Sequence, residues 1–232
     1  MDSIIDSIRR AFDPIRYEGL PFIVIAGLAA IIFGLLWSPL FWIGAIVTAW
    51  IAYFFRDPPR VSPQDSNLVL SPADGTVAAI GEAVPPEELG LGTDPLPRVS
   101  VYMTVLNCHV NRAPAAGRVG RVAYKPGKFV NAEIDKASED NERNSVVIET
   151  QHGLVGVVQI AGLIARRILC WTSEGDKLVA GQRFGMIRFG SRLDVFLPAG
   201  AAITVSEGQT AIAGETTIAW FGGVAGWPVR VD

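Results

Sequence analysis

An uncharged, apolar run from residue 20 to residue 55 constrains this chain more than any other feature of its sequence. Crossing a bilayer once takes ~20 such residues, so the run exceeds what a single span needs. Its one clear interruption, Ser38-Pro39, divides it into two equal halves. As a helix, each half rises roughly 27 Å, which suits either two tilted crossings or a hairpin that dips in from one leaflet. The run is too long for a cleaved signal peptide and predicts an N-terminal helical membrane hairpin.

Basic residues flank the apolar run on both sides. They are, in order along the chain, Arg9, Arg10, Arg16, Arg56 and Arg60. Positively charged flanks stay on the cytoplasmic side of a membrane. We therefore expect both ends of the hairpin, and the rest of the chain, to lie on the cytoplasmic face of the inner cell membrane.

The residues before the hairpin and just after it set the expected domain boundary. Apolar residues recur at helical spacing at Ile4, Ile5, Ile8, Phe12 and Ile15. This spacing predicts an amphipathic helix that lies at the membrane interface. After the run, Pro58-Pro59 stops any helix. We expect residues 1–56 to form the amphipathic helix and hairpin, and residues 57–232 to form the working domain.

The working domain has the pattern of a β protein. From residue 63 onward, short runs of β-forming residues alternate with Gly, Pro, Asn and Asp. The clearest runs are residues 76–80, 99–105, 145–149, 154–160, 184–189, 194–197 and 203–205. Residues 162–169 are ambiguous between strand and helix. No strand–helix alternation occurs, which disfavours a parallel sheet. The fold class is predicted as mainly β, with an antiparallel sandwich or barrel-like catalytic domain.

Composition excludes several functions. A net charge of −3 and the lack of an arginine- or lysine-rich run disfavour nucleic acid as a partner. There are two histidines, His109 and His152, too few for a His-rich zinc site. Cys108 and Cys170 lack a paired spacing and are expected to be free thiols. No phosphate-binding glycine loop or common hydrolase motif is found.

Four stretches together resemble one known family. They read FFRDP at 54–58 followed by SPADGTV at 71–77, LNCHVNRAP at 106–114, KFVNA to NERN at 128–144, and GMIRFGSR at 185–192. QIAG at 159–162 lies between the last two. In this order and spacing they resemble the pyruvoyl-dependent phosphatidylserine decarboxylase family, particularly its short, membrane-anchored, archaeal-type-like branch.

The resemblance implies an enzyme that makes its own cofactor. Ser191 would attack the carbonyl of Gly190, and elimination and hydrolysis would leave a pyruvoyl group on the new amino terminus. The proenzyme would thus give a β chain of 1–190 and an associated α chain of 191–232. Phosphatidylserine would be decarboxylated to phosphatidylethanolamine through a Schiff base with that group. Neither a metal nor pyridoxal phosphate is expected as a cofactor. The lysines are predicted to be exposed, which disfavours any of them as an attachment site for pyridoxal phosphate.

The resemblance also suggests roles for three further residues. His109 is the candidate general acid and base, and Asp74 the carboxylate that orients it. Many family members have a second histidine three residues after the first, where this chain has Arg112. Arginine stays protonated and cannot act as a base. We therefore expect His109 to serve both self-cleavage and protonation of the product, and Arg112 to bind the phosphate or carboxylate of the substrate.

Two other functions stay open at this point. Residues 175–182 and 207–216 look like hairpins of lipoyl or biotinyl domains, which would suit a membrane-tethered binding module, although neither has a convincing modifiable lysine. A membrane hydrolase with Ser191, His109 and Asp74 would use the same residues but keep the chain intact. Within the decarboxylase interpretation, acyl and ether-linked serine lipids are both open, and a homodimer is a reasonable default. Glu149 and Asp194 are expected to be ordinary strand-end carboxylates.

Overall fold

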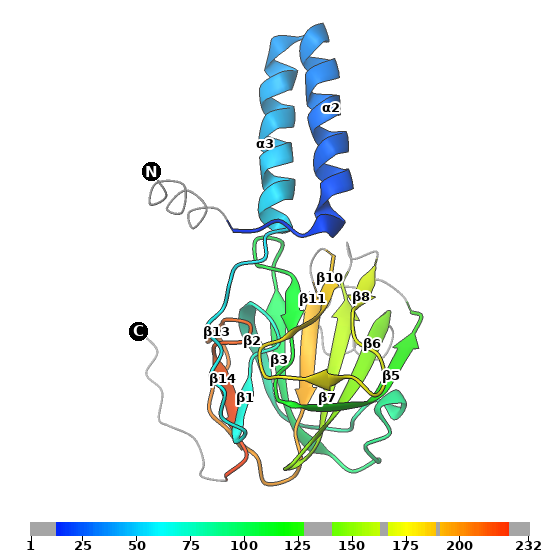
Figure 1. The fold of residues 1–232 in the computed structure, drawn as a ribbon, viewed down its shortest axis with the longest axis vertical. Helices are drawn as coiled ribbons and strands as arrows, with labels where there is room; N and C mark the ends of the chain where they lie inside the picture. Colours follow the sequence, from blue (N-terminus) through cyan, green and yellow to red (C-terminus); the bar gives the residue numbers. More distant parts are fainter. Residues whose placement is uncertain (1–12, 128–140, 163–166, 189–190, 223–232) are drawn as a thin grey trace. The chain divides into compact units, whose positions relative to one another are not determined.

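A computed structural model describes residues 13–127, 141–162, 167–188 and 191–222 of the 232-residue chain. It contains two compact units, residues 1–59 and residues 60–232. The predicted amphipathic helix lies almost entirely outside the described residues and stays a prediction. In the first unit, a short 3-10 helix η1 (Tyr17–Gly19) leads into the helices α2 (Leu20–Leu36) and α3 (Ser38–Phe54) (Figure 1).

The break between α2 and α3 falls where the sequence predicts it. Trp37 is extended, with φ −157° and ψ 117°, and α3 begins at the next residue. Pro39 occupies the first turn of α3, where its missing N–H has no helical partner to lose. The predicted interruption at Ser38-Pro39 is therefore confirmed.

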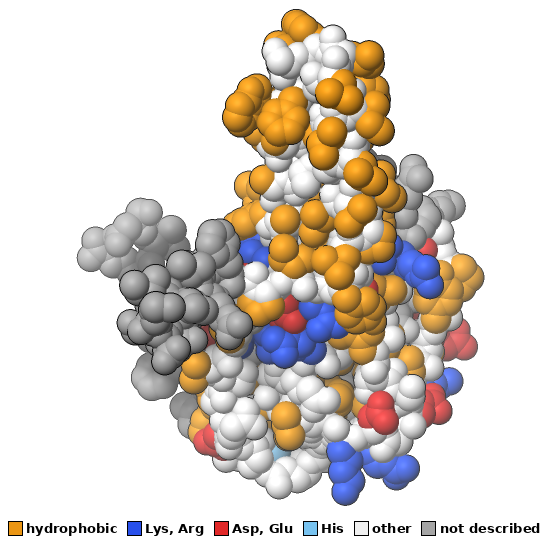
Figure 2. All heavy atoms as spheres, turned by 45° about the horizontal axis from the view of Figure 1, so that its top comes forward, with side chains coloured by type: hydrophobic (Ala, Val, Ile, Leu, Met, Phe, Trp, Pro, Cys, Tyr) orange, Lys and Arg blue, Asp and Glu red, His pale blue; other side chains and the backbone are white. Residues whose placement is uncertain are grey.

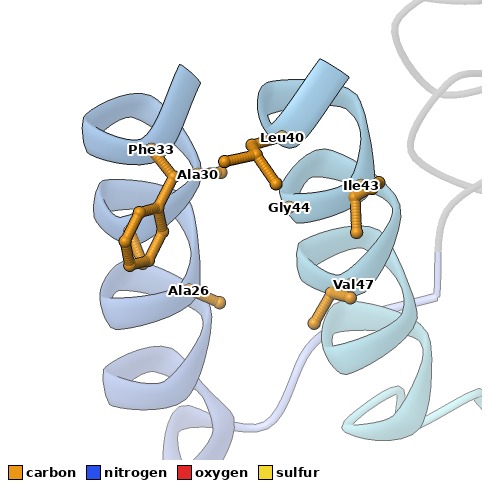
Figure 3. Close-up of a pocket in the computed structure, with 8 residues that line it drawn as sticks. Ala26, Ala30, Phe33, Leu40, Ile43, Gly44 and Val47 are labelled. Atoms are coloured by element: carbon orange, nitrogen blue, oxygen red, sulfur yellow. The ribbon is translucent and has the colours of Figure 1, made fainter. Parts of the chain in front are cut away.

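Small residues let α2 and α3 pack closely against each other. Ala30 faces Gly44 across the pair (Figure 3). A Cβ atom added to Gly44 would lie 2.5 Å from the Cβ of Ala30, so only glycine fits there. Close approach through small residues is the usual packing of helices in lipid, where no hydrophobic force drives them together.

Figure 2 shows apolar side chains covering much of the visible face of the helix pair, and both helices expose large hydrophobic side chains. Leu35, Leu36 and Ile46 are 83%, 78% and 70% exposed. The helical stretch Tyr17–Leu36 is long and apolar enough to cross a membrane, whereas Ser38–Phe54 is shorter. Apolar surface of this extent is typical of a segment covered by lipid or by other protein.

The second unit is built from antiparallel strands, which confirms the predicted fold class. Its described strands form one eight-stranded sheet and two three-stranded sheets. The large sheet runs β13 (Thr210–Ala211), β2 (Gly75–Ala83), β3 (Leu96–Met103), β11 (Ser191–Phe196), β7 (Gly153–Ala161), β6 (Arg143–Thr150), β5 (Gly117–Lys125) and β9 (Lys177–Leu178). The small sheets are β1 (Leu68–Leu70), β14 (Thr217–Trp220) and β12 (Ala202–Ile203), and β4 (Val110–Arg112), β10 (Arg183–Ile187) and β8 (Ile168–Cys170).

The large sheet buries both of its faces. Alternate residues of the central strands, among them Val101, Val157 and Leu193, form the main apolar core on the inner face. The intervening residues, such as Ile160 and Phe196, belong to a second, smaller cluster on the outer face. The connection between β2 and β3, with the 3-10 helix η2 (Glu87–Leu89), contributes Leu89 to that cluster. The central strands are therefore apolar on both sides, as in a protein interior.

The second unit contains the same arrangement twice. The sheet order is symmetric about the β11–β7 pair, so that β13, β2, β3 and β11 correspond to β9, β5, β6 and β7. Equivalent backbone bonds recur in the two halves, from Val77 N to Gln209 O (2.9 Å) and from Val119 N to Asp176 O (2.8 Å). The segments that look like lipoyl hairpins, residues 175–182 and 207–216, occupy equivalent places in these halves. The two segments that resemble lipoyl hairpins are thus equivalent parts of an internal duplication.

The duplication allows the start of β11 to be compared with the start of β7 in the other half of the fold. In one half, β6 and β7 are joined by a tight turn between Thr150 and Gly153, which are paired. In the other half, the equivalent pair is Met103 with Ser191, and residues 104–190 lie between them in sequence. Ser191 is therefore the residue at which the chain returns to the first half of the fold.

Candidate active site

Ser191 is the first residue of β11 and is completely buried. It pairs with Met103 of β3 on one side and with Ala161 of β7 on the other (Figure 1). Its hydroxyl oxygen has no hydrogen-bond partner among the described residues. Buried hydroxyls usually have a partner. Those of Ser100 and Ser145 in the same sheet also lack one, so the position of Ser191 at the start of β11 is what distinguishes it. Gly190, the other half of the predicted cleavage site, lies outside the described residues.

His109 is held next to the strand that leads toward Ser191. It is completely buried, immediately before β4, and its backbone oxygen accepts a bond from Ile187 N at the end of β10 (3.3 Å). Its ring Nδ1 lies 2.9 Å from the backbone oxygen of Asn107. Since a carbonyl oxygen can only accept, Nδ1 carries a proton, and in the neutral ring Nε2 is the basic nitrogen.

Asp74 lies just before β2, at the end of the sheet where Met103 and Ser191 pair. Its Oδ2 accepts a bond from Arg60 Nη2 at 2.6 Å, and its Oδ1 accepts one from Ala213 N at 2.8 Å. Among the described residues none of its hydrogen bonds goes to His109. The imidazole is oriented by the Asn107 carbonyl instead, and an orienting role of Asp74 stays a prediction.

Arg112 is 6% exposed and lies at the end of β4. Its Nη1 donates to the backbone oxygen of Gly181 at 3.0 Å. Gly214 adjoins it, and a Cβ atom there would lie 2.9 Å from Arg112 Cδ. Arg112 also contributes to an open pocket of about 520 Å³, whose lining includes Arg60, Arg112 and Arg183. Three guanidinium groups make this pocket suited to an anion.

Two buried ion pairs support the strands around Ser191. Arg192 binds Asp194 through two contacts, Nε to Oδ1 at 2.9 Å and Nη2 to Oδ2 at 3.0 Å. Asp194 is 1% exposed within β11, so its prediction as an ordinary strand-end carboxylate is wrong. Arg143, at the start of β6, forms two contacts with Glu88 of η2, one of them between Nη2 and Oε2 at 3.0 Å. Both pairs are on the outer face of the sheet, opposite the Ser191 side chain.

The family model described as phosphatidylserine decarboxylase matches residues 47–219, well over half of the chain. The chain belongs to this family. The match includes Asp74, His109, Arg112 and Ser191. The phosphatidylserine decarboxylase family implies a lyase of phospholipid metabolism.

The decarboxylase fold brings together residues whose partners the sequence did not reveal. The pairing of Arg60 with Asp74 joins positions 14 residues apart across a loop, and no local pattern predicts it. The sequence also did not indicate that three buried amides form one hydrogen-bonded group, which consists of Asn111, Gln159 and Asn144. For Gln159 a signal existed, because it alternates in register with Val155 and Val157, whose side chains face the core.

The Glu88–Arg143 pair gives a prediction for stability. Burial, the largest single influence, raises the pKa of Glu88, but the hydrogen bond from Arg143, a backbone hydrogen bond and the charges of Arg143 and Lys125 together outweigh it and leave the pKa below its ordinary value of 4.5. The pair therefore contributes fully to stability above pH 4.5, and this contribution is lost as the pH falls through the lower pKa of the folded state. Glu88→Gln should lower the free energy of unfolding by about 2 kcal/mol at neutral pH.

Urea unfolding of the full chain in detergent, followed by tryptophan fluorescence, measures this loss. The difference from the unmutated protein should shrink as the pH is lowered below 4.5. Glu87→Gln, at the exposed neighbouring carboxylate, is the control and should leave stability unchanged. An equal loss in both variants, or a difference that does not change with pH, would contradict the assignment.

Proposed function

We propose that this chain is a membrane-attached phosphatidylserine decarboxylase that cleaves itself between Gly190 and Ser191 and converts Ser191 into a pyruvoyl group. The observation that carries this proposal is the buried Ser191 hydroxyl, which has no hydrogen-bond partner in the described residues and begins a central strand within the matched family region.

The residues present fit the formation of this group. The oxygen of Ser191 attacks the carbonyl carbon of Gly190, so that an ester replaces the peptide bond and the hydroxyl proton passes to the released nitrogen. Loss of the Cα proton of Ser191 then breaks its Cβ–Oγ bond, and Gly190 leaves as a carboxylate. Water finally displaces the nitrogen as ammonia. The resulting pyruvoyl group supplies a carbonyl that accepts electrons from the substrate when carbon dioxide leaves.

His109 is the residue best suited to move protons in this sequence. It is buried close to the end of β10 at Ile187, four residues before Ser191 in sequence, and its proton on Nδ1 leaves Nε2 as the basic atom. Because its backbone is bonded to Ile187, the ring is tied to the segment that is cut. The same imidazole can return a proton to the product carbon.

The two chains made by cleavage are expected to stay together. β11 belongs to the new α chain, and it pairs along its whole length with β3 and β7 of the β chain. β13 and β14 of the α chain likewise pair with β2 and β1. Separating the chains would break the centre of the large sheet, so cleavage removes one covalent bond and little packing. A homodimer stays a prediction.

The substrate assignment rests on three features that are independent of Ser191. The family match indicates a serine phospholipid. The apolar surface of α2 and α3 suits insertion into a membrane, and the basic flanks favour its cytoplasmic side. The pocket with Arg60, Arg112 and Arg183 offers positive charge for a phosphate or carboxylate. The lipid chains, acyl or ether-linked, do not alter this headgroup chemistry.

Replacing Ser191 tests the proposal directly. Ser191→Ala should give a single uncut chain that releases no carbon dioxide from phosphatidylserine in vesicles, because the nucleophile is lost. Denaturing electrophoresis and a carbon dioxide assay measure the two effects. Ser145→Ala is the matched control, since it also removes a buried hydroxyl without a partner from the same sheet, and it should be cut normally. Cleavage of Ser191→Ala, or an uncut unmutated chain that still releases carbon dioxide, would exclude the proposal. An uncut unmutated chain that releases no carbon dioxide but hydrolyses the lipid would favour a hydrolase.

Replacing His109 tests the proposed base. His109→Gln should slow self-cleavage by roughly 100-fold or more, as expected for the loss of a general base. The rate is measured on precursor made by cell-free translation and sampled over time. His152→Gln is the control, because that ring lies in the β6–β7 turn and stacks on Phe221 at 4.7 Å. A precursor with His109→Gln that matures at the normal rate would remove His109 from this role.

A further inference from the structure

A row of three buried side-chain amides crosses the interior of the second unit. Asn144 Nδ2 of β6 donates to Gln159 Oε1 of β7 at 2.9 Å. Gln159 Nε2 in turn donates to Asn111 Oδ1 of β4 at 2.7 Å. The three residues are 4%, 0% and 0% exposed. Buried amides are costly unless they are bonded, so their presence in an apolar core calls for a reason.

The row ends beside Ser191. Asn111 Nδ2 contacts the sulfur of Met103 at 3.9 Å, and Met103 is directly opposite Ser191 in the sheet. Residues directly opposite each other in antiparallel strands have their side chains on the same face. Gln159 lies two residues before Ala161, the other partner of Ser191, and therefore also shares this face. The amide row and the Ser191 side chain thus lie on the same, inner face of the sheet.

The sulfur of Met103 sets the direction of the row. A thioether can only accept a hydrogen bond, so Asn111 must present its NH₂ group to it and its oxygen to Gln159. This orientation then determines those of Gln159 and Asn144 in turn. A bond to sulfur at this distance is weak. Asn111 therefore keeps donor capacity at the end of the row that faces Ser191.

A glycine makes room for this arrangement. Gly185 of β10 pairs with Asn111. A Cβ atom on Gly185 would lie 2.5 Å from the backbone oxygen of Leu169 in β8 and 2.7 Å from Gln159 Nε2, so both the neighbouring strand and the amide require glycine here. Any larger residue would displace the amide. Gly185 opens the last of the four stretches on which the family resemblance depends, and the row gives a physical reason for it.

We propose that the NH₂ group of Asn111 is the hydrogen-bond donor to the oxygen of Ser191 during self-cleavage. This inference rests on the proposed function. Once Ser191 has formed its ester, breaking the Cβ–Oγ bond transfers an electron pair to that oxygen, which departs as part of the carboxylate of Gly190. An N–H donor at this oxygen stabilises the developing charge. Gln159 and Asn144 hold Asn111 in the required orientation and are positioning residues.

The variant Asn111→Asp tests the donor with little change in shape. An aspartate keeps an oxygen for Gln159 and loses the NH₂ group. We expect precursor cleavage to slow roughly 100-fold, as for removal of one oxyanion donor, with the ester accumulating because its elimination is the step impaired. Hydroxylamine added to the uncut precursor should then release a fragment that begins at Ser191 with a free amino group, readable by N-terminal sequencing. The unmutated protein should give a blocked fragment.

Asn144→Asp is the matched comparison, since it makes the same isosteric change at the far end of the row. It should slow cleavage less than tenfold and accumulate no ester. Normal cleavage of Asn111→Asp, or equal slowing of both variants without ester, would overturn the inference and leave the row a structural network. If the unmutated precursor itself is never cut, the proposed function fails, which is a separate result.

Discussion

The pairing of β11 between β3 and β7 is the constraint on which the rest of this structure depends. It fixes Ser191 at the start of a central strand, where both neighbours and the burial of the strand prevent the hydroxyl from reaching solvent. The buried Arg192–Asp194 pair holds the residues that follow on the outer face of the same strand. Because water is excluded from this buried position, few hydrogen-bond partners compete for the Ser191 hydroxyl.

The internal duplication explains how a chain can be cut at this point without losing its fold. The break would fall where residues 104–190 rejoin β11, the place that a tight turn occupies in the other half of the fold. Strands on both sides of the break are held by pairing to their neighbours and not by the connection itself. The new terminus would therefore remain in place after the peptide bond is lost, which a buried electron-accepting group requires.

Much of the fold could be predicted from the sequence. Ser38-Pro39 marks the turn of the hairpin because proline ends one helix and fits the first turn of the next. Alternating apolar residues and regular turn signals gave the antiparallel β class. The duplication could not be recognised from the sequence, because its two halves share turn-forming residues more than they share the side chains of their strands. The sheet order, set by long-range pairing, has no local signal.

The site could be predicted only in part. The residues of the family stretches were identified, and the structure brings Asp74 and Ser191 to one end of the large sheet. The hydrogen-bond partners of Asp74 and His109 could not be predicted from the sequence. Asp74 binds Arg60 and Ala213, and the backbone oxygen of Asn107 orients His109. The burial of Asp194 was not predicted because charged residues are seldom fully buried unless they are paired. Its partner Arg192 lies two positions away on the same face of β11. Buried polar pairs are decided by tertiary packing, which a local pattern does not encode.

The central claim is that the bond between residues 190 and 191 breaks spontaneously and leaves a modified terminus. Intact mass spectrometry of the purified, active protein under denaturing conditions tests it most directly. Two masses are expected, one for residues 1–190 and one for residues 191–232. The smaller chain should be lighter than its sequence requires by one ammonia, because the serine nitrogen is lost, its hydroxyl oxygen stays with Gly190 and water supplies the keto oxygen. An active protein with one mass for all 232 residues would contradict it.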